Sequence, residues 1–570
     1  MTTSPSSTFA TLLAARKEAA LAAASGIAPI VWNAEQEQAI SLGAAIPFRS
    51  FCLVGAAGTG KSTVTTDVIK SISKKYRLTE ETKYLRKGSP AVAIITFTRR
   101  AANNARRLVH DDMKGNVLTS HKLLEYSRDF EDVYDPETGV FKTKVVFFPT
   151  RNARNPLPKS LKVIVVDEAS TLAYETLYKQ VREAAPHCEF IFIGDLNQLP
   201  PVGGDGVLGY KLQELPTVEL THVYRQALES KPLALAHRVL SGEPIYTKEL
   251  KSEWSGHPDL NIMTWDASLK NDWKLAVQVA ASVLKMRFQS GDYDPDNDIV
   301  LCPFSQKKFC TDELNRWILD FAFPDRQVHQ VIAGFNEHYL AVGDNVLYNK
   351  DDYVIEKINR NAGYRGKAPS DIPCDRWGRG KIGQKFIYEQ EQKPVIDMTE
   401  NGGKFTAQDI ADAAAFFGGE EFEYNVEAIA EGEDDRVNQA SHVIHLRSID
   451  NPEQEVKISS SGDINAITFG HAVSVHKAQG SGWDRVFLFI HNSHATLLSR
   501  ELLYTAITRT KKKLEIFCEN DTFVKGIRAQ RIPGKTAAEK AKYFQAKVGT
   551  KNSTKEQESE TITEDLEQEA

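Results

Sequence analysis

The sequence predicts an α/β protein whose parallel strands carry polar loops at their carboxyl ends. Apolar runs at 51–54, 161–166 and 190–193 have the length and composition of buried strands. Each run ends in glycine or in acidic residues, and a helix-like segment follows the first run, as expected for parallel strands connected by helices. With 570 residues the chain is too long for a single core and should contain about three or four domains.

Charge is unevenly distributed along the chain. The formal net charge is −6, and residues 553–570 hold seven acids and one lysine, which account for all of it. The rest of the chain is therefore neutral overall and can still carry a local basic channel. Candidate basic runs are Arg99–Arg100, Arg106–Arg107 and Lys511–Lys513.

The sequence has no feature that indicates export or a membrane partner. No apolar run approaches the roughly 20 residues of a membrane span. Residues 1–30 lack the basic start and continuous apolar core of a secretory signal. The six cysteines are scattered without a Cys-x-x-Cys pair, which argues against a zinc site and suits a reducing compartment. We therefore expect a cytoplasmic protein.

A phosphate-binding loop follows the first apolar run. The segment GAAGTGKST, Gly55–Thr63, fits the pattern G-x-x-x-x-G-K-[ST] between a strand and a helix. Its glycines let backbone N–H groups and the helix N-terminus face a β-phosphate. Lys61 would bridge the β- and γ-phosphates, and Ser62 would hold Mg²⁺. The residues expected to contact the nucleotide are Gly55, Gly58, Thr59, Gly60, Lys61, Ser62 and Thr63.

Two carboxylates follow the second run, at Asp167 and Glu168. A nucleotide hydrolase needs acids at the end of a second strand, to fix the metal ion and to activate water. Asp167 is expected to hold Mg²⁺ through its hydration shell, and Glu168 to polarise the attacking water. An acidic pair of this kind is also common in helix caps, and only its combination with the phosphate loop makes it specific.

The third run leads into GDLNQLPPVGG, residues 194–204. Proline cannot continue a strand, so Leu199–Pro201 is a stiff, extended exit. If this strand lies beside the other two in a parallel sheet, Gln198 stands at the ligand-binding edge and can hydrogen-bond a γ-phosphate or the attacking water. The alternative is a surface turn that happens to contain polar residues.

The order of these and further segments resembles helicases of superfamily 1B, especially the RecD-like and phage Dda-like group. The resemblance covers roughly residues 31–350 and 465–520. The segments that carry it are WNAEQEQAI (32–40), GAAGTGKST (55–63), TFTRRAA (96–102), LTSHKLL (118–124), DEAS (167–170), GDLNQLPPV (194–202), LTHVYRQ (220–226), VSVHKAQGSGWDRV (473–486) and LLYTAITRTKKKL (502–514).

The resemblance implies two RecA-like lobes that use ATP and Mg²⁺ to translocate along single-stranded DNA in the 5′ to 3′ direction and to separate a duplex fork. Gln36 would read adenine, and Gly480 is also assigned to the nucleotide. Arg225 and Arg509 would act as cationic fingers that neutralise charge on the transferred phosphoryl group, with a surface salt bridge as the alternative role for each.

The resemblance also implies a set of strand-binding residues. They are Phe97, Thr98, Arg99, Thr119, His121, His476, Lys477 and Gln479. Phe97 departs from the family pattern, which has proline at that position. Its ring can either stack on a base, which is worth about 1–3 kcal/mol, or serve as an ordinary core residue.

Other functions stay open at the level of sequence. A P-loop ATPase motor or a nucleotide-gated DNA-binding switch would need the same phosphate loop without strand separation. A fused relaxase would need a cluster of histidines and a fused nuclease a cluster of acids with lysine, and neither arrangement is evident at either end. RNA is an alternative track, because phosphate and stacking contacts discriminate poorly between sugars. Replication or recombination proteins are candidate partners, in the cytoplasm of a bacterium or of a phage-infected host.

The resemblance and the composition together suggest the following domains. An N-terminal extension (1–30) precedes a first motor lobe (31–230) that carries an inserted hairpin (122–160), followed by a second lobe in two parts (231–345 and 462–533), an inserted accessory domain (346–461) and an acidic, partly disordered tail (534–570).

Both insertions have recognisable local patterns. Residues 131–148 form two alternating runs about a turn, Asp135–Gly139, and predict a β-hairpin with an acidic tip. It is a candidate strand-separating wedge or, alternatively, a surface hairpin away from the fork. By resemblance, 346–461 contains a small β-barrel like a Src-homology-3 domain, with an additional helix within 407–424 for which we have no function.

Overall fold

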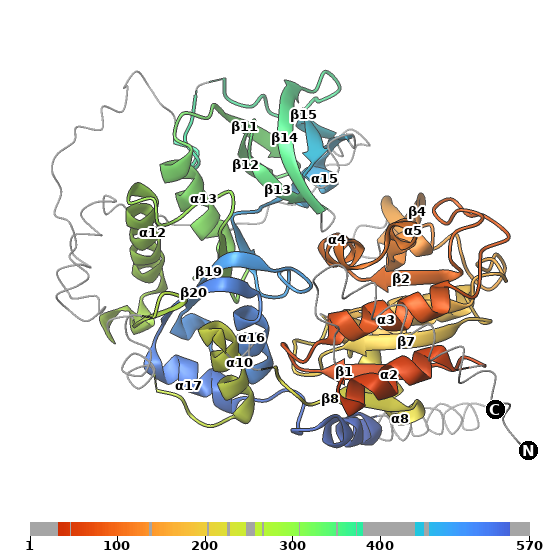
Figure 1. The fold of residues 1–570 in the computed structure, drawn as a ribbon. Helices are drawn as coiled ribbons and strands as arrows, with labels where there is room; N and C mark the ends of the chain where they lie inside the picture. The colour runs from red at the N-terminus through yellow and green to blue at the C-terminus, as the bar shows by residue number, and fades with distance from the viewer. Residues whose placement is uncertain are drawn as a thin grey trace, which may run out of the picture.

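The computed structural model describes residues 32–45, 47–135, 140–201, 204–224, 229–246, 257–264, 267–306, 308–348, 351–371, 373–379, 439–449 and 455–547. Within these ranges the chain forms two parallel sheets, each flanked by helices, and an antiparallel region above the second sheet in the view of Figure 1.

The first parallel sheet has the strand order β3-β2-β6-β7-β1-β8. Strand β7 lies between β6 and β1, with Ile191 opposite Phe51 and Glu189 opposite Val163. The expectation that the third apolar run lies beside the other two is confirmed, so the loops that follow these strands share one edge of the sheet. The strands are β1 (Phe51–Gly55), β2 (Val92–Thr96), β3 (Val117–Thr119), β6 (Val163–Val166), β7 (Glu189–Gly194) and β8 (Thr217–Leu220).

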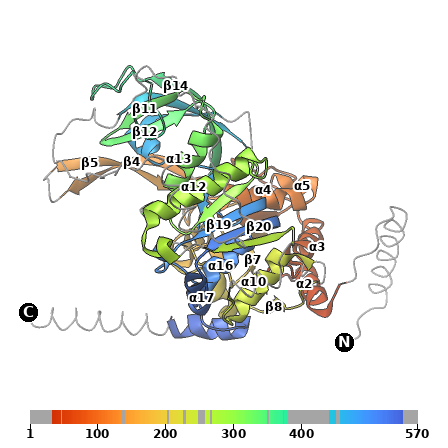
Figure 2. The same ribbon diagram turned by 90° about the vertical axis from the view of Figure 1, so that its left-hand side faces the viewer.

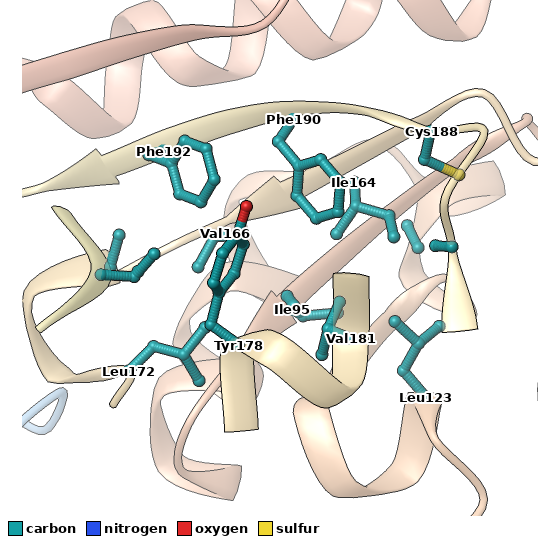
Figure 3. Close-up of a cluster of buried hydrophobic side chains, with 14 of the residues drawn as sticks. Ile95, Leu123, Ile164, Val166, Leu172, Tyr178, Val181, Cys188, Phe190 and Phe192 are labelled. Atoms are coloured by element: carbon teal, nitrogen blue, oxygen red, sulfur yellow. The ribbon is translucent and has the colours of Figure 1, made fainter. Parts of the chain in front are cut away.

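Helices cover both faces of this sheet because successive strand residues point to opposite faces. Ile191 and Ile193 belong to one apolar core, and Phe190 and Phe192 to another. Figure 3 shows the second core, where Tyr178 faces both phenylalanines. The helices of this lobe are α2 (Ala34–Ala44), α3 (Lys61–Ser73), α4 (Arg99–Leu108), α5 (Asp111–Lys114), α6 (Ser120–Leu123), η1 (Ala169–Thr171), η2 (Tyr174–Tyr178), α7 (Lys179–Ala184) and α8 (Val207–Glu214).

The second parallel sheet has the order β18-β10-β19-β20-β9. One core packs α10, α16 and α17 on it, and another packs α12 and α13. Its elements are β9 (Leu260–Thr264), β10 (Ile299–Cys302), β18 (Ala472–Ser474), β19 (Trp483–Ile490), β20 (Thr510–Cys518), α10 (Lys231–Ser241), η3 (Ala267–Asn271), α12 (Trp273–Gln289), α13 (Thr311–Ala322), η4 (Asn492–His494), α16 (Arg500–Ile507) and α17 (Asn520–Arg528). Two helix-flanked parallel sheets confirm the predicted α/β class with two lobes.

A long antiparallel hairpin projects from the first lobe (Figure 2). Its strands are β4 (Ser127–Asp135) and β5 (Val140–Phe148), paired in continuous register from Ser127 opposite Phe148 to Asp135 opposite Val140. The hairpin predicted at 131–148 is therefore present, with its strand β4 starting at Ser127. Residues 136–139, which make most of its predicted tip, lie outside the described residues.

The insertion in the second lobe is antiparallel, in agreement with the expected β subdomain. Its larger sheet has the order β16-β15-β14-β13-β17, and the hairpin β11–β12 shares its apolar core. The subdomain therefore begins at Val328, upstream of the suggested boundary at 346, because β11 packs against β15. The helix expected within 407–424 lies outside the described residues. The elements are β11 (Val328–Ala333), β12 (Asn336–Ala341), β13 (Asn345–Tyr348), β14 (Asp351–Arg360), β15 (Gln439–Ser448), β16 (Glu455–Ser460), α15 (Ser461–Asn465) and β17 (Thr468–Phe469).

The chain after α17 returns to the first lobe. Residues 537–547 are helical, and in Figure 1 this dark blue helix lies below α8 and β8. The side chain of Phe544 is 2% exposed and its ring centroid lies 5.6 Å from that of Tyr210. The segment assigned to the acidic tail from residue 534 therefore begins with a packed helix.

Within the described ranges, the chain contains no helix that is both long enough and apolar enough to cross a bilayer.

Candidate nucleotide and nucleic-acid site

The phosphate loop joins β1 to α3 as the sequence predicts. Gly58 and Gly60 have φ of +81° and +85°, a left-handed conformation that glycine adopts without strain. The Lys61 ammonium donates to the carbonyl oxygens of Gly55 and Ala56, at 2.7 and 2.9 Å. Lys61 is thus held on its own loop, close to where a phosphate would replace those carbonyls. Ser62 and Thr63 lie in the first turn of α3.

The acidic pair follows β6 at the same edge of the sheet. Burial and the neighbouring charge of Glu168 raise the pKa of Asp167 to about 7, whereas the Lys61 ammonium lowers it. Glu168 has a φ of +51°, which is rare for a residue with a side chain and is typical of strained functional positions. Its Oε2 atom is buried, and no described residue gives it a hydrogen-bond partner.

The loop after β7 lies against this acidic pair. A Cβ atom on Gly194 would stand 3.2 Å from the Ser170 nitrogen, so the two loops are in close contact. Gln198 is 6% exposed, and its buried Oε1 atom has no hydrogen-bond partner among the described residues. Buried polar atoms are normally paired. An orphaned carboxylate oxygen and an orphaned amide oxygen on adjoining loops therefore fit a hydrated Mg²⁺–nucleotide, with Ser62 and Asp167 as the candidate metal-holding residues.

Gln36 lies beside the phosphate loop. It closes a capping box with Asn33 at the start of α2, and its Nε2 atom would be 3.0 Å from a Cβ atom placed on Gly60. The hydroxyl of Tyr224 donates to Gln36 Oε1 at 2.6 Å. Tyr224 is a site residue that the sequence analysis missed, although it immediately precedes Arg225. Arg225 itself lies outside the described residues.

The second lobe grips the Gln198 loop, defined here as Asp195–Leu199. Leu199 is fully buried within the apolar core of the second lobe. Its N–H donates to Thr505 Oγ1 at 2.9 Å, and its carbonyl accepts from Gln479 Nε2 at 2.7 Å. The prolines that follow keep this residue extended. The loop is therefore an interlobe connection, which excludes the alternative of a surface turn.

Tyr504 of α16 joins both loops of the first lobe. Its hydroxyl donates to Asp195 Oδ2 at 2.6 Å and accepts from the Ala57 N–H at 2.7 Å. His237 of α10 lies 3.0 Å from the Ala57 carbonyl oxygen. Sequence reasoning missed Tyr504 and His237, because only the contact between lobes reveals what they touch.

Arg509 is buried near Tyr504. Burial raises the pKa of the Tyr504 hydroxyl, and the positive charge of Arg509 acts in the opposite direction. The Arg509 guanidinium donates to the carbonyl oxygens of Thr505 and Ser481, at 3.0 and 3.1 Å, and to Thr508 Oγ1. In this structure Arg509 is thus held by its own lobe, next to the helix that reaches the phosphate loop.

A second meeting of the lobes involves the predicted strand-binding residues. Thr98 caps α4 by accepting from the Ala101 N–H. Gly480 has a φ of +73°, and a Cβ atom there would stand 2.8 Å from Ala101 Cβ. Asn104 Nδ2 donates to the Gly480 carbonyl at 3.0 Å. The contacts of Gly480 are therefore with α4, among the candidate strand-binding residues rather than with the phosphate loop.

Arg100 also connects the two lobes near Gly480. Its guanidinium forms a two-point ion pair with Asp352 of β14 and lies 5.2 Å from the ring of Trp483 in β19. One side chain of the first lobe therefore contacts the second lobe and the inserted subdomain together. Arg99, its neighbour, is partly exposed.

The remaining predicted strand-binding residues divide between the lobes. The ring of Phe97 is half-buried, packs partly against the lobe core, and lies 6.2 Å from His121. Thr119 caps the short helix that contains His121. His476 and Lys477 lie on the loop after β18, where Lys477 is exposed and donates to Thr468 Oγ1 at 3.0 Å.

Comparison with known proteins agrees with this arrangement. A family model described as an AAA domain matches residues 36–204, and one described as a UvrD-like helicase C-terminal domain matches residues 469–516. The chain is 24% identical over 479 residues to the ATP-dependent RecD2 DNA helicase of Deinococcus radiodurans. It is 21% identical over 487 residues to the RecBCD enzyme subunit RecD of Buchnera aphidicola subsp. Schizaphis graminum. Over most of its length the chain is therefore similar to RecD-type helicases at low sequence identity.

These alignments cover most of this chain but less of its relatives. They include 84% of this chain and 48% of the Deinococcus protein, and 83% of this chain and 71% of the Buchnera protein. The chain thus spans about half the length of the first relative. A crystal structure of Pif1 helicase from Bacteroides in complex with ADP-AlF3 and ssDNA aligns at 15% identity and a TM-score of 0.43, over 91% of this chain and 98% of that one.

Proposed function

We propose that this RecD-like chain is an ATP-dependent DNA helicase that translocates 5′ to 3′ on single-stranded DNA. In this proposal its motor lobes are residues 31–230 and 231–345 with 462–533. The observation that carries the proposal is the Gln198 loop. It presents an unpaired amide beside the acidic pair, and the second lobe holds it through Leu199 and Asp195.

Hydrolysis would depend on residues of both lobes. Lys61 would exchange the carbonyls of its own loop for β- and γ-phosphate oxygens. Ser62 and Asp167 would hold Mg²⁺, which would supply positive charge beside the phosphates. Glu168 orients and polarises the attacking water. Arg509, once released from its own lobe, and Arg225 stabilise the charge of the transferred group.

Coupling to DNA would follow from the two interlobe contacts. When Gln198 binds a γ-phosphate, its loop moves. The hydrogen bonds of the loop transmit this movement to Tyr504, Thr505 and Gln479 of the second lobe. The same movement changes the contact of Gly480 with α4, where the candidate strand-binding residues Thr98 and Arg99 stand. Binding or hydrolysis of the nucleotide would thereby change the contacts that the protein makes with the DNA strand.

The decisive experiment measures ATP hydrolysis with and without single-stranded DNA, and unwinding of duplexes with a 5′ or a 3′ tail of DNA or RNA. We expect hydrolysis to rise on adding single-stranded DNA and 5′-tailed DNA duplexes to open. Stimulated hydrolysis without unwinding would instead favour a translocase or packaging motor. Absence of any stimulation by DNA or RNA would contradict both.

A further inference from the structure

We propose that residues 530–547 form a strap between the lobes, and that Lys540 within it is a positioning residue for the Gln198 loop. The strap begins on α16, where the carboxylate of Glu501 accepts from the backbone N–H groups of Arg531 and Ile532 at 3.0 and 3.1 Å. This start lies on the helix that also carries Tyr504 and Thr505.

The strap ends on the first lobe. The N–H of Ala537 donates to Glu219 Oε1 at 3.0 Å, and Lys547 forms a 2.7 Å ion pair with Asp205. Between these two points Phe544 packs against α8, where a Cβ atom on Gly209 would stand 2.4 Å from its ring. The aromatic ring therefore occupies the space that a larger residue at 209 would fill, which fixes the strap on α8.

Lys540 reaches from the strap into the Gln198 loop. Its side chain is buried, with the residue only 3% exposed, and its ammonium donates to the Leu196 carbonyl at 2.9 Å and to Asn197 Oδ1 at 2.7 Å. Asn197 in turn donates through its N–H and its Nδ2 to Asp195 Oδ1, both at 2.9 Å. Lys540 thereby holds the turn from Asp195 to Asn197 in a single conformation.

A buried ammonium is costly unless hydrogen bonds and nearby charge compensate it. No carboxylate in the described part of the chain forms an ion pair with Lys540. Burial lowers the pKa of its ammonium, and the negative charges of Asp195, Glu501 and Glu219 offset only part of that effect. Packing alone would be served by an apolar side chain of similar length. The specific contribution of the ammonium is therefore its hydrogen bonds to the Gln198 loop.

The strap thus completes a two-sided hold on the Gln198 loop. Tyr504, Thr505 and Gln479 bind the loop from the second lobe, and Lys540 binds it from a segment anchored on both lobes. This inference rests on the proposed function, in which Gln198 reads the γ-phosphate. Without Lys540 the Gln198 loop would move less closely with the second lobe. The rate of hydrolysis would then depend less on the position of the two lobes relative to each other.

The test compares Lys540→Met with Lys540→Arg and with the control Lys542→Met, which removes an exposed lysine of the same helix. We expect Lys540→Met to lower the kcat of DNA-stimulated hydrolysis about tenfold, the effect of losing a hydrogen bond to a charged group, with KM for ATP within about twofold of wild type. Lys540→Arg should restore most of the rate because it keeps a buried cation and donor, and Lys542→Met should match wild type. An unchanged kcat in Lys540→Met overturns the proposal.

A readout that does not depend on activity separates this proposal from the proposed function. Amide hydrogen exchange at Gln198 and Leu199 should be faster in Lys540→Met than in wild type, with α17 and β20 unchanged in the same sample. Faster exchange throughout both lobes would show a merely structural role and overturn the proposal. If wild type shows no DNA-stimulated hydrolysis, the proposed function fails, and local loop exchange still decides whether Lys540 positions the loop.

Discussion

In the proposed function Lys61 and Glu168 have different chemical roles, and single substitutions separate them. Lys61→Ala removes the cation that would bridge the phosphates, so hydrolysis should fall by at least about a hundredfold. Glu168→Gln keeps the shape but not the charge needed to polarise water, so ATP should bind with near wild-type affinity and stay uncleaved. The measurements are steady-state ATPase and binding of a fluorescent ATP analogue. Wild-type turnover in either variant would contradict the assignment.

His494 provides a residue-scale prediction about stability. It is fully buried, accepts from the His491 N–H through Nδ1 at 3.0 Å, and therefore donates to the Phe309 carbonyl through Nε2 at 2.7 Å as a neutral ring. Burial lowers its pKa from 6.5 to about 3. Below pH 6.5 the unfolded chain takes up a proton that the folded chain does not, so stability falls as the pH falls.

Between pH 7 and pH 5 this single group should reduce the free energy of unfolding by about 2 kcal/mol. Urea unfolding followed by tryptophan fluorescence at the two pH values measures the loss. His494→Gln, which cannot titrate, should show a smaller pH dependence even if it is less stable at pH 7. Equal pH dependence in both proteins would show that His494 takes up its proton over the same pH range in the folded and unfolded chains, and would contradict the prediction.

At the scale of single elements, the Gln198 loop should couple hydrolysis to DNA. Gln198→Ala removes the amide that we propose reads the γ-phosphate, and Tyr504→Phe removes the hydroxyl that joins Asp195 to Ala57. Both variants should lower DNA-stimulated hydrolysis and unwinding about tenfold while nucleotide binding stays within about twofold, since neither side chain belongs to the phosphate loop. Equal losses in binding, hydrolysis and unwinding would indicate a structural loop.

The hairpin β4–β5 is the second element with a testable role. Deleting residues 136–139 shortens the tip but leaves the paired strands, whose register runs without interruption to Asp135 and Val140. If the tip obstructs the fork, unwinding should fall severalfold while DNA-stimulated hydrolysis stays at the wild-type rate. The acidic tip should repel the backbone, which fits obstruction better than binding. Unwinding at the wild-type rate after the deletion would refute the wedge.

Elements also show how far the sequence could be interpreted. The strands β1, β6 and β7, the phosphate loop and the hairpin were predictable because their signals are local: short apolar runs, glycine spacing and alternation about a turn. The partners of Asp195 and Leu199 were not predictable, because Tyr504 and Thr505 are more than 300 residues away and belong to another lobe. The packing of Phe544 was also missed, because two adjacent aromatic residues, Tyr543 and Phe544, in a charged helix carry no periodic signal.

At the scale of the whole molecule, the nucleotide site and the candidate strand-binding surface both lie where the lobes meet. The first meeting holds the phosphate loop and the Gln198 loop against α16, and the second holds α4 against Gly480 and Trp483. Separation of the lobes would break both sets of contacts together. A single rigid-body motion can therefore link hydrolysis to strand release without any local unfolding.

Direction of travel is the property that tests the whole arrangement. If the first lobe leads along the strand, the hairpin it carries meets the duplex first, because the hairpin is inserted between the Thr119 segment and Asp167 of that lobe. The motor should then open a duplex with a 5′ single-stranded tail and leave one with only a 3′ tail closed. Fluorescence unwinding assays on the two substrates, at equal tail length and equal duplex stability, give the answer. Efficient opening of the 3′-tailed duplex would indicate that the second lobe leads. The hairpin would then lie behind the motor, where it could not separate strands.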